Sequence, residues 1–285
     1  MSRFGQRTRV STAISAWMPS GDEVPQNPSS IEMLLVGGGG AGSGGNAVYY
    51  PITNAAQGGG GGAGGVYSSV SGNPGGGPGG AVAPVTPIAA GVTYTIVIGG
   101  SGTASTFSAP TISTITASAG GGGGGVAGPG GGSGGYTGQP SGYGGGSPHY
   151  GSSEWTSAGG GGGAGGAGAS PAYTPSGVGM AGASIINTIR ASSPTFPQYY
   201  GGGGAAGSID NYIGGAGTAN SQPGTYGTGG TGSHAGPTGP GQPGVCVFRY
   251  PDTFPSAPTA TGDPTLITTG GYHIYTFTAS GTIAW

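Results

Sequence analysis

Short runs of apolar and β-branched residues lie near both ends of the chain, and long glycine blocks lie between them. Three runs in the first part predict strands, at residues 31–36, 92–98 and 111–117. In the second run, alternation places Tyr94, Ile96 and Ile98 on one face, as expected for a strand with one buried side.

Three further runs predict an antiparallel cluster of strands near the end of the chain, at residues 245–250, 265–269 and 272–278. Gly270 and Gly271 separate the last two runs, and such a two-residue link is a hairpin signal. No amphipathic helix stands out, and the best short helix candidate is residues 184–191. We expect the terminal strands to supply a modest hydrophobic core at the base of the glycine-rich middle.

Glycine blocks supply 76 of the 285 residues. Extended left-handed chains with three residues per turn can pack closely where no Cβ intervenes, and their backbone groups must then bond to neighbouring chains. We therefore expect the blocks to form polyglycine-II helices packed in a bundle. A three-residue step at Gly224, Gly227, Gly230, Gly236 and Gly239 fits, with Ser233 as the one exception. Collagen is not favoured, because Gly-X-Y does not persist.

The predicted fold class is mainly β and irregular, with almost no α-helix. Short antiparallel strands from both chain ends would pack at the base of the polyglycine-II bundle, which carries long connecting loops. We divide the chain into an N-terminal attachment segment (1–30), strands with the first glycine tracts (31–118), a glycine-rich region with aromatic loops (119–244) and a C-terminal β segment (245–285).

Composition narrows the function further. The chain has five arginines, seven acidic residues and no lysine, so it lacks the positive charge that phosphate binding requires, and nucleic acid is not an expected partner. Its 15 tyrosines, 6 phenylalanines and 3 tryptophans argue for an ordered protein. No stretch is apolar enough to span a membrane. Cys246 stands alone in an apolar run, which predicts a buried, inert thiol.

Motifs for catalysis or cofactor binding are not found. The glycines after residue 36 are followed by no acidic residue between positions 43 and 65, so a dinucleotide site is not expected, and a P-loop would need a lysine. His149, His234 and His273 are far apart in the sequence and have no clustered ligands. We expect no enzyme activity, no metal and no cofactor.

Aromatic residues gather between the glycine blocks, beside serine, asparagine and glycine. This combination is typical of binding surfaces. The segments are residues 46–57, 136–158, 170–200 and 208–213. The same rings would also serve to seal the ends of a glycine lattice, and the sequence leaves both interpretations open.

The order of segments resembles the glycine-rich domain of bacteriophage tail-fibre proteins. The resemblance rests on IEMLLVGGGGAGSGG from residue 31, GGGGGAGGV from 58, YTIVIGG from 94, GVCVFRYPDT from 244 and ITTGGYHIYTFTASGTIAW from 267. It also extends to the glycine-rich adhesins at fibre tips, in which connecting loops contact the host. The resemblance implies a virion protein, assembled in the host cytoplasm, that binds a receptor without a cofactor.

The resemblance implies roles for particular residues of this chain. The receptor-contact candidates are Tyr49, Tyr50, Tyr143, His149, Tyr150, Trp155, Tyr199, Tyr200 and Tyr212. The virion-attachment candidates are Arg3, Phe4, Arg7, Arg9 and Trp17. Expected partners are a bacterial surface polysaccharide or outer-membrane protein and other tail or fibre proteins, with a homotrimer as the assembly considered. The N-terminal segment before residue 31 is short and contains no long fibrous shaft, so we expect that a separate protein could form the shaft of the fibre.

Two other functions remain open from the sequence. The chain would fit a purely structural virion or extracellular filament subunit, whose loops are subunit interfaces. It would also fit an ice-binding protein, because glycine-helix bundles can present regular flat faces, although the bulky aromatic segments argue against this.

Overall fold

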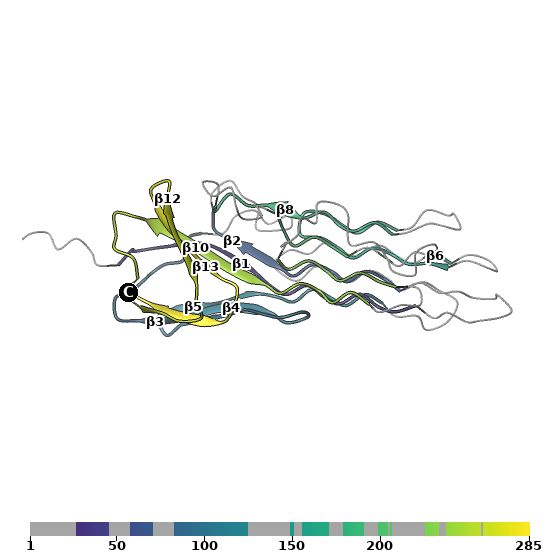
Figure 1. Ribbon diagram of the computed structural model, residues 1–285, viewed down its shortest axis with the longest axis horizontal. Helices are drawn as coiled ribbons and strands as arrows, with labels where there is room; N and C mark the ends of the chain where they lie inside the picture. Colours follow the sequence, from purple (N-terminus) through teal and green to yellow (C-terminus); the bar gives the residue numbers. More distant parts are fainter. Residues whose placement is uncertain are drawn as a thin grey trace, which may run out of the picture.

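The computed structural model describes residues 27–45, 58–70, 83–124, 149–150, 156–170, 179–190, 199–204, 206, 226–233, 238–257 and 259–285. In these residues the protein is built from antiparallel β-strands and contains no helix, which confirms the predicted mainly-β class. Two larger sheets lie at one end of an elongated molecule, and the glycine tracts extend from them toward the other end (Figure 1).

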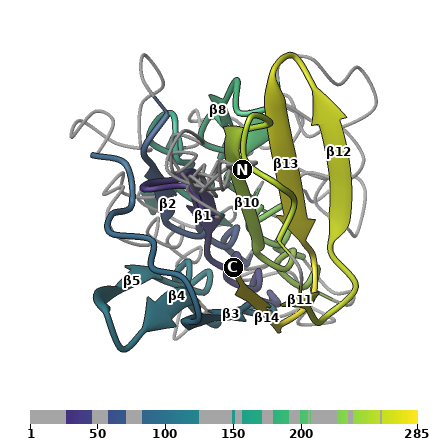
Figure 2. The same cartoon turned by 90° about the vertical axis from the view of Figure 1, so that its left-hand side faces the viewer.

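Each of the larger sheets combines strands from distant parts of the sequence. The first sheet has the order β12 (Thr265–Thr269), β13 (Tyr272–Phe277), β10 (Val245–Pro251), β1 (Glu32–Val36) and β2 (Val66–Ser68). The second has the order β11 (Thr259–Ala260), β14 (Gly281–Ala284), β3 (Thr93–Val97), β4 (Ser105–Ala109) and β5 (Ile112–Ala117). Figure 2 shows the two sheets meeting near the C-terminus.

The main core lies between the two sheets and is largely aromatic. Phe248 of β10 stacks on Tyr275 at 5.3 Å between ring centroids. From the second sheet, Tyr94 lies 5.6 Å from Phe107, and Trp285 meets Tyr94 edge-on at 5.5 Å. The predicted alternation of β3 is confirmed, because Tyr94 and Ile96 are fully buried while Thr93, Thr95 and Val97 are exposed.

A second core covers the opposite face of the first sheet. Residues of the segment 179–204, among them Ile185, Ile189 and Tyr200, pack there against Leu34 and Val247. This segment also contributes two small strands, β8 (Ile185–Ile186) and β9 (Tyr199–Tyr200), which pair with each other. A further small pair, β6 (His149–Tyr150) and β7 (Thr156–Ser157), lies farther along the molecule (Figure 1).

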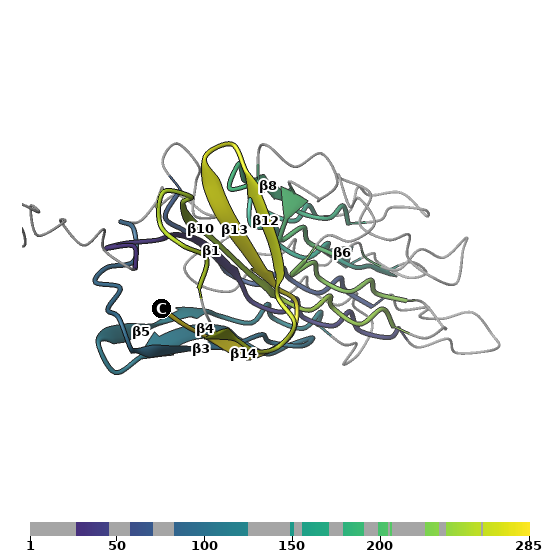
Figure 3. The same ribbon diagram turned by 60° about the vertical axis from the view of Figure 1, so that its left-hand side comes forward.

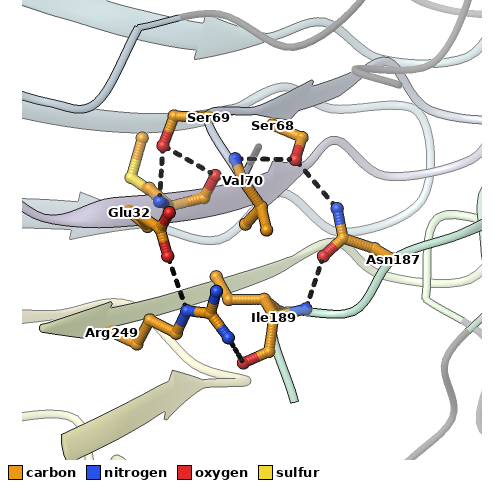
Figure 4. A network of polar contacts seen from close by, with 8 residues as sticks. Glu32, Ser68, Ser69, Val70, Asn187, Ile189 and Arg249 are labelled. Carbon is orange, nitrogen blue, oxygen red and sulfur yellow. Dashed lines mark hydrogen bonds and ion pairs between the residues drawn. The ribbon is translucent and has the colours of Figure 1, made fainter. Parts of the chain in front are cut away.

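Polar contacts fix the 185–190 segment against the first sheet (Figure 4). Arg249 Nε donates to Glu32 Oε2 at 2.6 Å, and Arg249 Nη1 donates to the carbonyl of Ile189 at 3.3 Å. Asn187 donates to Ser68 Oγ at 2.8 Å and accepts the amide of Ile189 at 2.9 Å. These bonds explain why the helix candidate at 184–191 is wrong: β8 and the Asn187 side chain use the backbone groups that a helix would need.

The predicted strands are confirmed with small shifts at their ends. Those expected at 31–36, 92–98 and 111–117 correspond to β1, β3 and β5, and those expected near the end correspond to β10, β12 and β13. The hairpin at Gly270-Gly271 is also confirmed, because Thr269 and Tyr272 are paired across it. Cys246 is fully buried, as expected.

Backbone hydrogen bonds join the glycine tracts to one another. In the tract at residues 58–65, the amides of Gly58, Gly61 and Gly64 donate to Ser233, Gly230 and Gly227. The amides of Gly59, Gly62 and Gly65 donate instead to Gly124, Gly121 and Ser118. The amides of Gly60 and Ala63 donate to Gly159 and Gly162. Every third residue of this tract therefore bonds to the same neighbouring segment, and three different neighbours are served in turn.

In the tract at residues 37–45, every third residue likewise bonds to one neighbour, the 58–65 tract. The amides of Gly37, Gly40 and Ser43 donate to the carbonyls of Gly65, Gly62 and Gly59. Figures 1 and 3 show these tracts lying side by side along the length of the molecule. The sheets and several tracts are thus continuous, since the tract at 37–45 follows β1 directly and the tract at 58–65 leads directly into β2.

Candidate functional site

The candidate site is the end of the glycine tracts that lies opposite the two larger sheets, and we call it the distal end. Four residues mark it: Gly45, Gly58, Gly124 and Ser233. The amides of Gly45 and Gly58 both donate to the carbonyl of Ser233, at 2.7 and 3.0 Å, and Gly59 donates to Gly124 at 3.4 Å. Residues far apart in the sequence therefore meet at the distal end.

Three of these residues, Gly45, Gly58 and Gly124, border segments in which receptor-contact candidates were predicted. Gly45 and Gly58 flank residues 46–57, which contain Tyr49 and Tyr50. Gly124 precedes residues 125–148, which contain Tyr143. The side chains of Tyr49, Tyr50 and Tyr143 lie outside the described residues, but the points where their segments begin or end are held together by backbone hydrogen bonds.

Two more candidates, His149 and Tyr150, form one strand of a neighbouring pair of short strands, and a third, Trp155, lies in the interval between these strands. His149 pairs with Ser157 and Tyr150 pairs with Thr156, so β6 and β7 flank residues 151–155. Trp155 falls in that interval and lies outside the described residues, as do the side chains of His149 and Tyr150. Next to β7, Gly159 accepts the amide of Gly60 at 3.2 Å, which connects this hairpin to the tracts of the distal end.

Tyr199 and Tyr200 occupy a different place from the other candidates. Both lie in β9, which pairs with β8 beside the first sheet, away from β6 in the view of Figure 1. Tyr200 has 2% of its surface exposed and packs in the second core, so its assignment as a receptor contact is corrected to a core residue. The side chain of Tyr199 lies outside the described residues.

The remaining predicted site residues are outside the described part of the chain. Tyr212 lies in the interval 207–225, and the attachment candidates Arg3, Phe4, Arg7, Arg9 and Trp17 lie in the first 26 residues. Their predicted roles stay predictions. Sequence reasoning did not single out Ser233, whose backbone holds Gly45 and Gly58, because it looked only like an interruption of the glycine step.

The backbone supplies both the shape and the polarity of the distal end. A Cβ added to Gly58 would lie closer than 3.0 Å to Ser43, and one added to Gly61 would collide equally with Gly40. Ser43 contributes the main side-chain bonds here: its Oγ accepts the amide of Gly59 at 2.9 Å and donates to the carbonyl of Gly124 at 2.5 Å. The scaffold therefore ends in a close-packed layer of amides that carries no charged side chain among these residues.

Among the described residues, Tyr200 and Cys246 are titratable groups with shifted pKa values, and both lie in the cores. Burial raises the pKa of Tyr200 to about 12, and burial also raises the pKa of the Cys246 thiol. The described residues contain no cluster of histidine, cysteine and carboxylate side chains that would hold a metal ion. Among the same residues no helix is long and apolar enough to cross a membrane.

The distal end offers surfaces for non-covalent contact. In the described ranges, no group of side chains is arranged as a recognisable catalytic site. Comparison of the chain with protein-family models, with curated proteins and with solved structures gives no match in any of the three. The function must therefore be argued from the residues and their arrangement.

Proposed function

We propose that this chain is a bacteriophage tail-fibre or fibre-tip protein that binds a receptor on the host-cell surface. In this proposal the glycine tracts are a rigid scaffold, and the aromatic segments that join them carry the binding surface. The expected receptor is a bacterial surface polysaccharide or outer-membrane protein, and binding is non-covalent, without catalysis or a cofactor. The protein would work on the virion, attached to other tail or fibre proteins, with a homotrimer as one assembly.

The observation that carries the proposal is the bonding of every third residue of the 58–65 tract to one neighbour. A helix with three residues per turn and outward-pointing amides would produce this pattern. We therefore propose that the tracts are polyglycine-II helices and that together they form a bundle. Such a bundle needs no apolar interior, because its amides satisfy one another.

The distal end is the best-supported position for the binding surface. Gly45, Gly58 and Gly124 border intervals that contain tyrosine, and the neighbouring β6–β7 pair borders the interval that contains Trp155. Aromatic side chains offer large contact area at a low cost in conformational entropy, and neighbouring serine and asparagine supply hydrogen bonds. Loops that are positioned by a rigid scaffold are also a common place for recognition residues.

Binding of the purified protein to host cells tests this proposal. We expect Trp155→Ala, and separately the Tyr49→Ala/Tyr50→Ala double variant, to lower the amount of protein retained on cells by about tenfold or more, as for loss of an interface hot spot. Thr95→Ala is the matched control, because Thr95 is exposed on the second sheet, away from the distal end. Its retention should equal that of the wild type.

Each variant should first be shown to unfold at the temperature of the wild type, so that a folding defect is not mistaken for lost binding. Equal retention of wild type, Trp155→Ala and the tyrosine double variant would contradict the proposal. Polymerisation of the wild type without binding to cells would favour a filament subunit instead.

A further inference from the structure

We propose that β12 is a docking edge that pairs with β12 of a second copy of this chain. The first sheet ends at β12, which lies at its outer side in Figure 2. An edge strand leaves alternate backbone N–H and C=O groups without a partner strand, so proteins normally protect such edges. The four edges of the two larger sheets differ in how they are protected.

Three of the edges carry a recognisable protection. β2 is largely buried, and Asn187 donates to its Ser68 hydroxyl. β11 has only two residues. In β5 the register with β4 shifts between Phe107 and Ala109, which indicates a β-bulge. A covered strand, a short strand and a bulge are the usual devices against edge-to-edge pairing.

β12 has none of these devices. Its five residues pair with β13 in an unbroken register from Thr265–Thr276 to Thr269–Tyr272. It contains no charged residue, no proline and no bulge, and four of its residues are threonine or isoleucine. No backbone hydrogen bond of the described residues joins it to anything except β13. Within the described part of the chain, β13 is thus the one strand that pairs with β12, and the outer edge of β12 has no partner strand there.

The side chains of β12 also favour association. Leu266 is 42% exposed although it lies on the same face of the sheet as Tyr275, its cross-strand partner, which belongs to the main core. On the other face, Ile267 is only half-buried. Both would be further covered by a strand laid against the edge.

The order of residues in β12 makes a second copy the best-fitting occupant. In an antiparallel pair centred on Ile267, each Ile267 would face its equivalent, and Thr265 would face Thr269 of the other copy. Leu266 would then face Thr268, so every pair joins residues on the same side of the sheet. Such β-branched and threonine pairs are favourable, and no like charges meet. The arrangement has twofold symmetry, as in most dimers.

A five-residue edge is small beside a typical stable interface, so we expect a weak, concentration-dependent dimer. The average mass of the full-length protein should rise with concentration in analytical ultracentrifugation. Leu266→Lys should raise the dissociation constant by at least about tenfold, because it places two like charges beside the paired edge. Val97→Lys is the matched control, since Val97 is 43% exposed on the second sheet, and it should leave the dissociation constant unchanged.

Cross-linking through introduced thiols tests the register independently. Cys246 is buried, so a thiol placed in β12 would be the reactive one. We expect Ile267→Cys to cross-link to itself with a short thiol-specific reagent. A mixture of Thr265→Cys and Thr269→Cys should cross-link far more than either variant alone, because like positions would lie about 13 Å apart along the strands.

A protein that stays monomeric at all concentrations and gives no Ile267→Cys cross-link would overturn the proposal. So would a dimer that Val97→Lys weakens and Leu266→Lys does not, since that result places the contact on the second sheet. Capture of a different virion protein by the β12 edge, with no self-association, would also overturn it. The proposal does not depend on receptor binding, because neither the sedimentation nor the cross-linking measurement involves a receptor.

Discussion

At single positions, glycine is required here because the backbones are too close for any side chain. A Cβ on Gly61 would come closer than 3.0 Å to backbone atoms of both Gly40 and Ala41. Backbone atoms cannot rotate away as a flexible side chain can, so the neighbouring tract would have to move. Gly122 differs, since a Cβ there would meet only the carbonyl of Ala41, at 3.7 Å.

These two positions give a matched pair of substitutions. We expect Gly61→Ala to lower the free energy of unfolding by roughly 1–3 kcal/mol or more, as overpacking of a close-packed interior does. Gly122→Ala should be neutral, or stabilising by up to about 1 kcal/mol, because alanine restricts the unfolded chain. Unfolding in urea measures both values. Equal effects of the two substitutions would contradict close packing of the tracts.

At the scale of elements, the hydrophobic pattern locates strands but not their partners. β3, β10 and β13 were predictable because each has apolar or β-branched residues over at least five positions. The short strands β2 and β14 were missed because three or four residues are too few to display an alternating pattern. Pairing of β1 with β10 joins residues more than two hundred positions apart, which no local pattern specifies.

Residues of the candidate site were predictable to a similar extent. The tyrosine and tryptophan segments stand out in the sequence, and the three-residue glycine step indicated how the tracts bond. Tyr200 was misassigned because its neighbour Tyr199 and the local composition give no sign of burial. Its burial depends on Ile189 and Val247, which reach it only through the tertiary fold.

The β12–β13 hairpin depends on backbone conformations that favour glycine. Gly270 has a φ of 60° and Gly271 a φ of 82°, as the tight turn between paired Thr269 and Tyr272 requires. We expect Gly270→Val to destabilise the protein by about 1–2 kcal/mol, because a β-branched residue is strained at positive φ. Gly270→Asn should cost much less, since asparagine tolerates this region. Urea unfolding of the two variants measures the difference, and equal losses would count against this turn geometry.

At the scale of the whole molecule, the burial of titratable groups links folding to pH. Burial raises the pKa of Tyr200 from 10.0 to about 12 and also raises the pKa of Cys246. In the unfolded chain these groups lose their protons at lower pH than in the folded protein. Their contribution to stability is therefore complete below their unfolded pKa values and is lost as the pH rises toward the folded values.

For Tyr200 the loss falls between about pH 10 and pH 12, and its full size is of the order of 2–3 kcal/mol. We expect the free energy of unfolding to fall over this range. Tyr200→Phe should flatten the fall, because phenylalanine has no proton to lose, while Tyr94→Phe should leave the contribution of Tyr200 in place. Urea unfolding at a series of pH values measures the slope. An unchanged slope in Tyr200→Phe would show that this phenol does not control alkaline stability.

The cyclic bonding of residues 58–65 to three neighbours has a consequence for how such a chain can change in length. Inserting one residue in the tract would move every later amide on to the next of the three neighbours, so each would face the wrong partner. Inserting three residues would return each later amide to the neighbouring segment it bonds to now. We therefore expect natural variation in the length of such tracts to occur in multiples of three residues, because only these insertions and deletions preserve the bonding partners of every later amide.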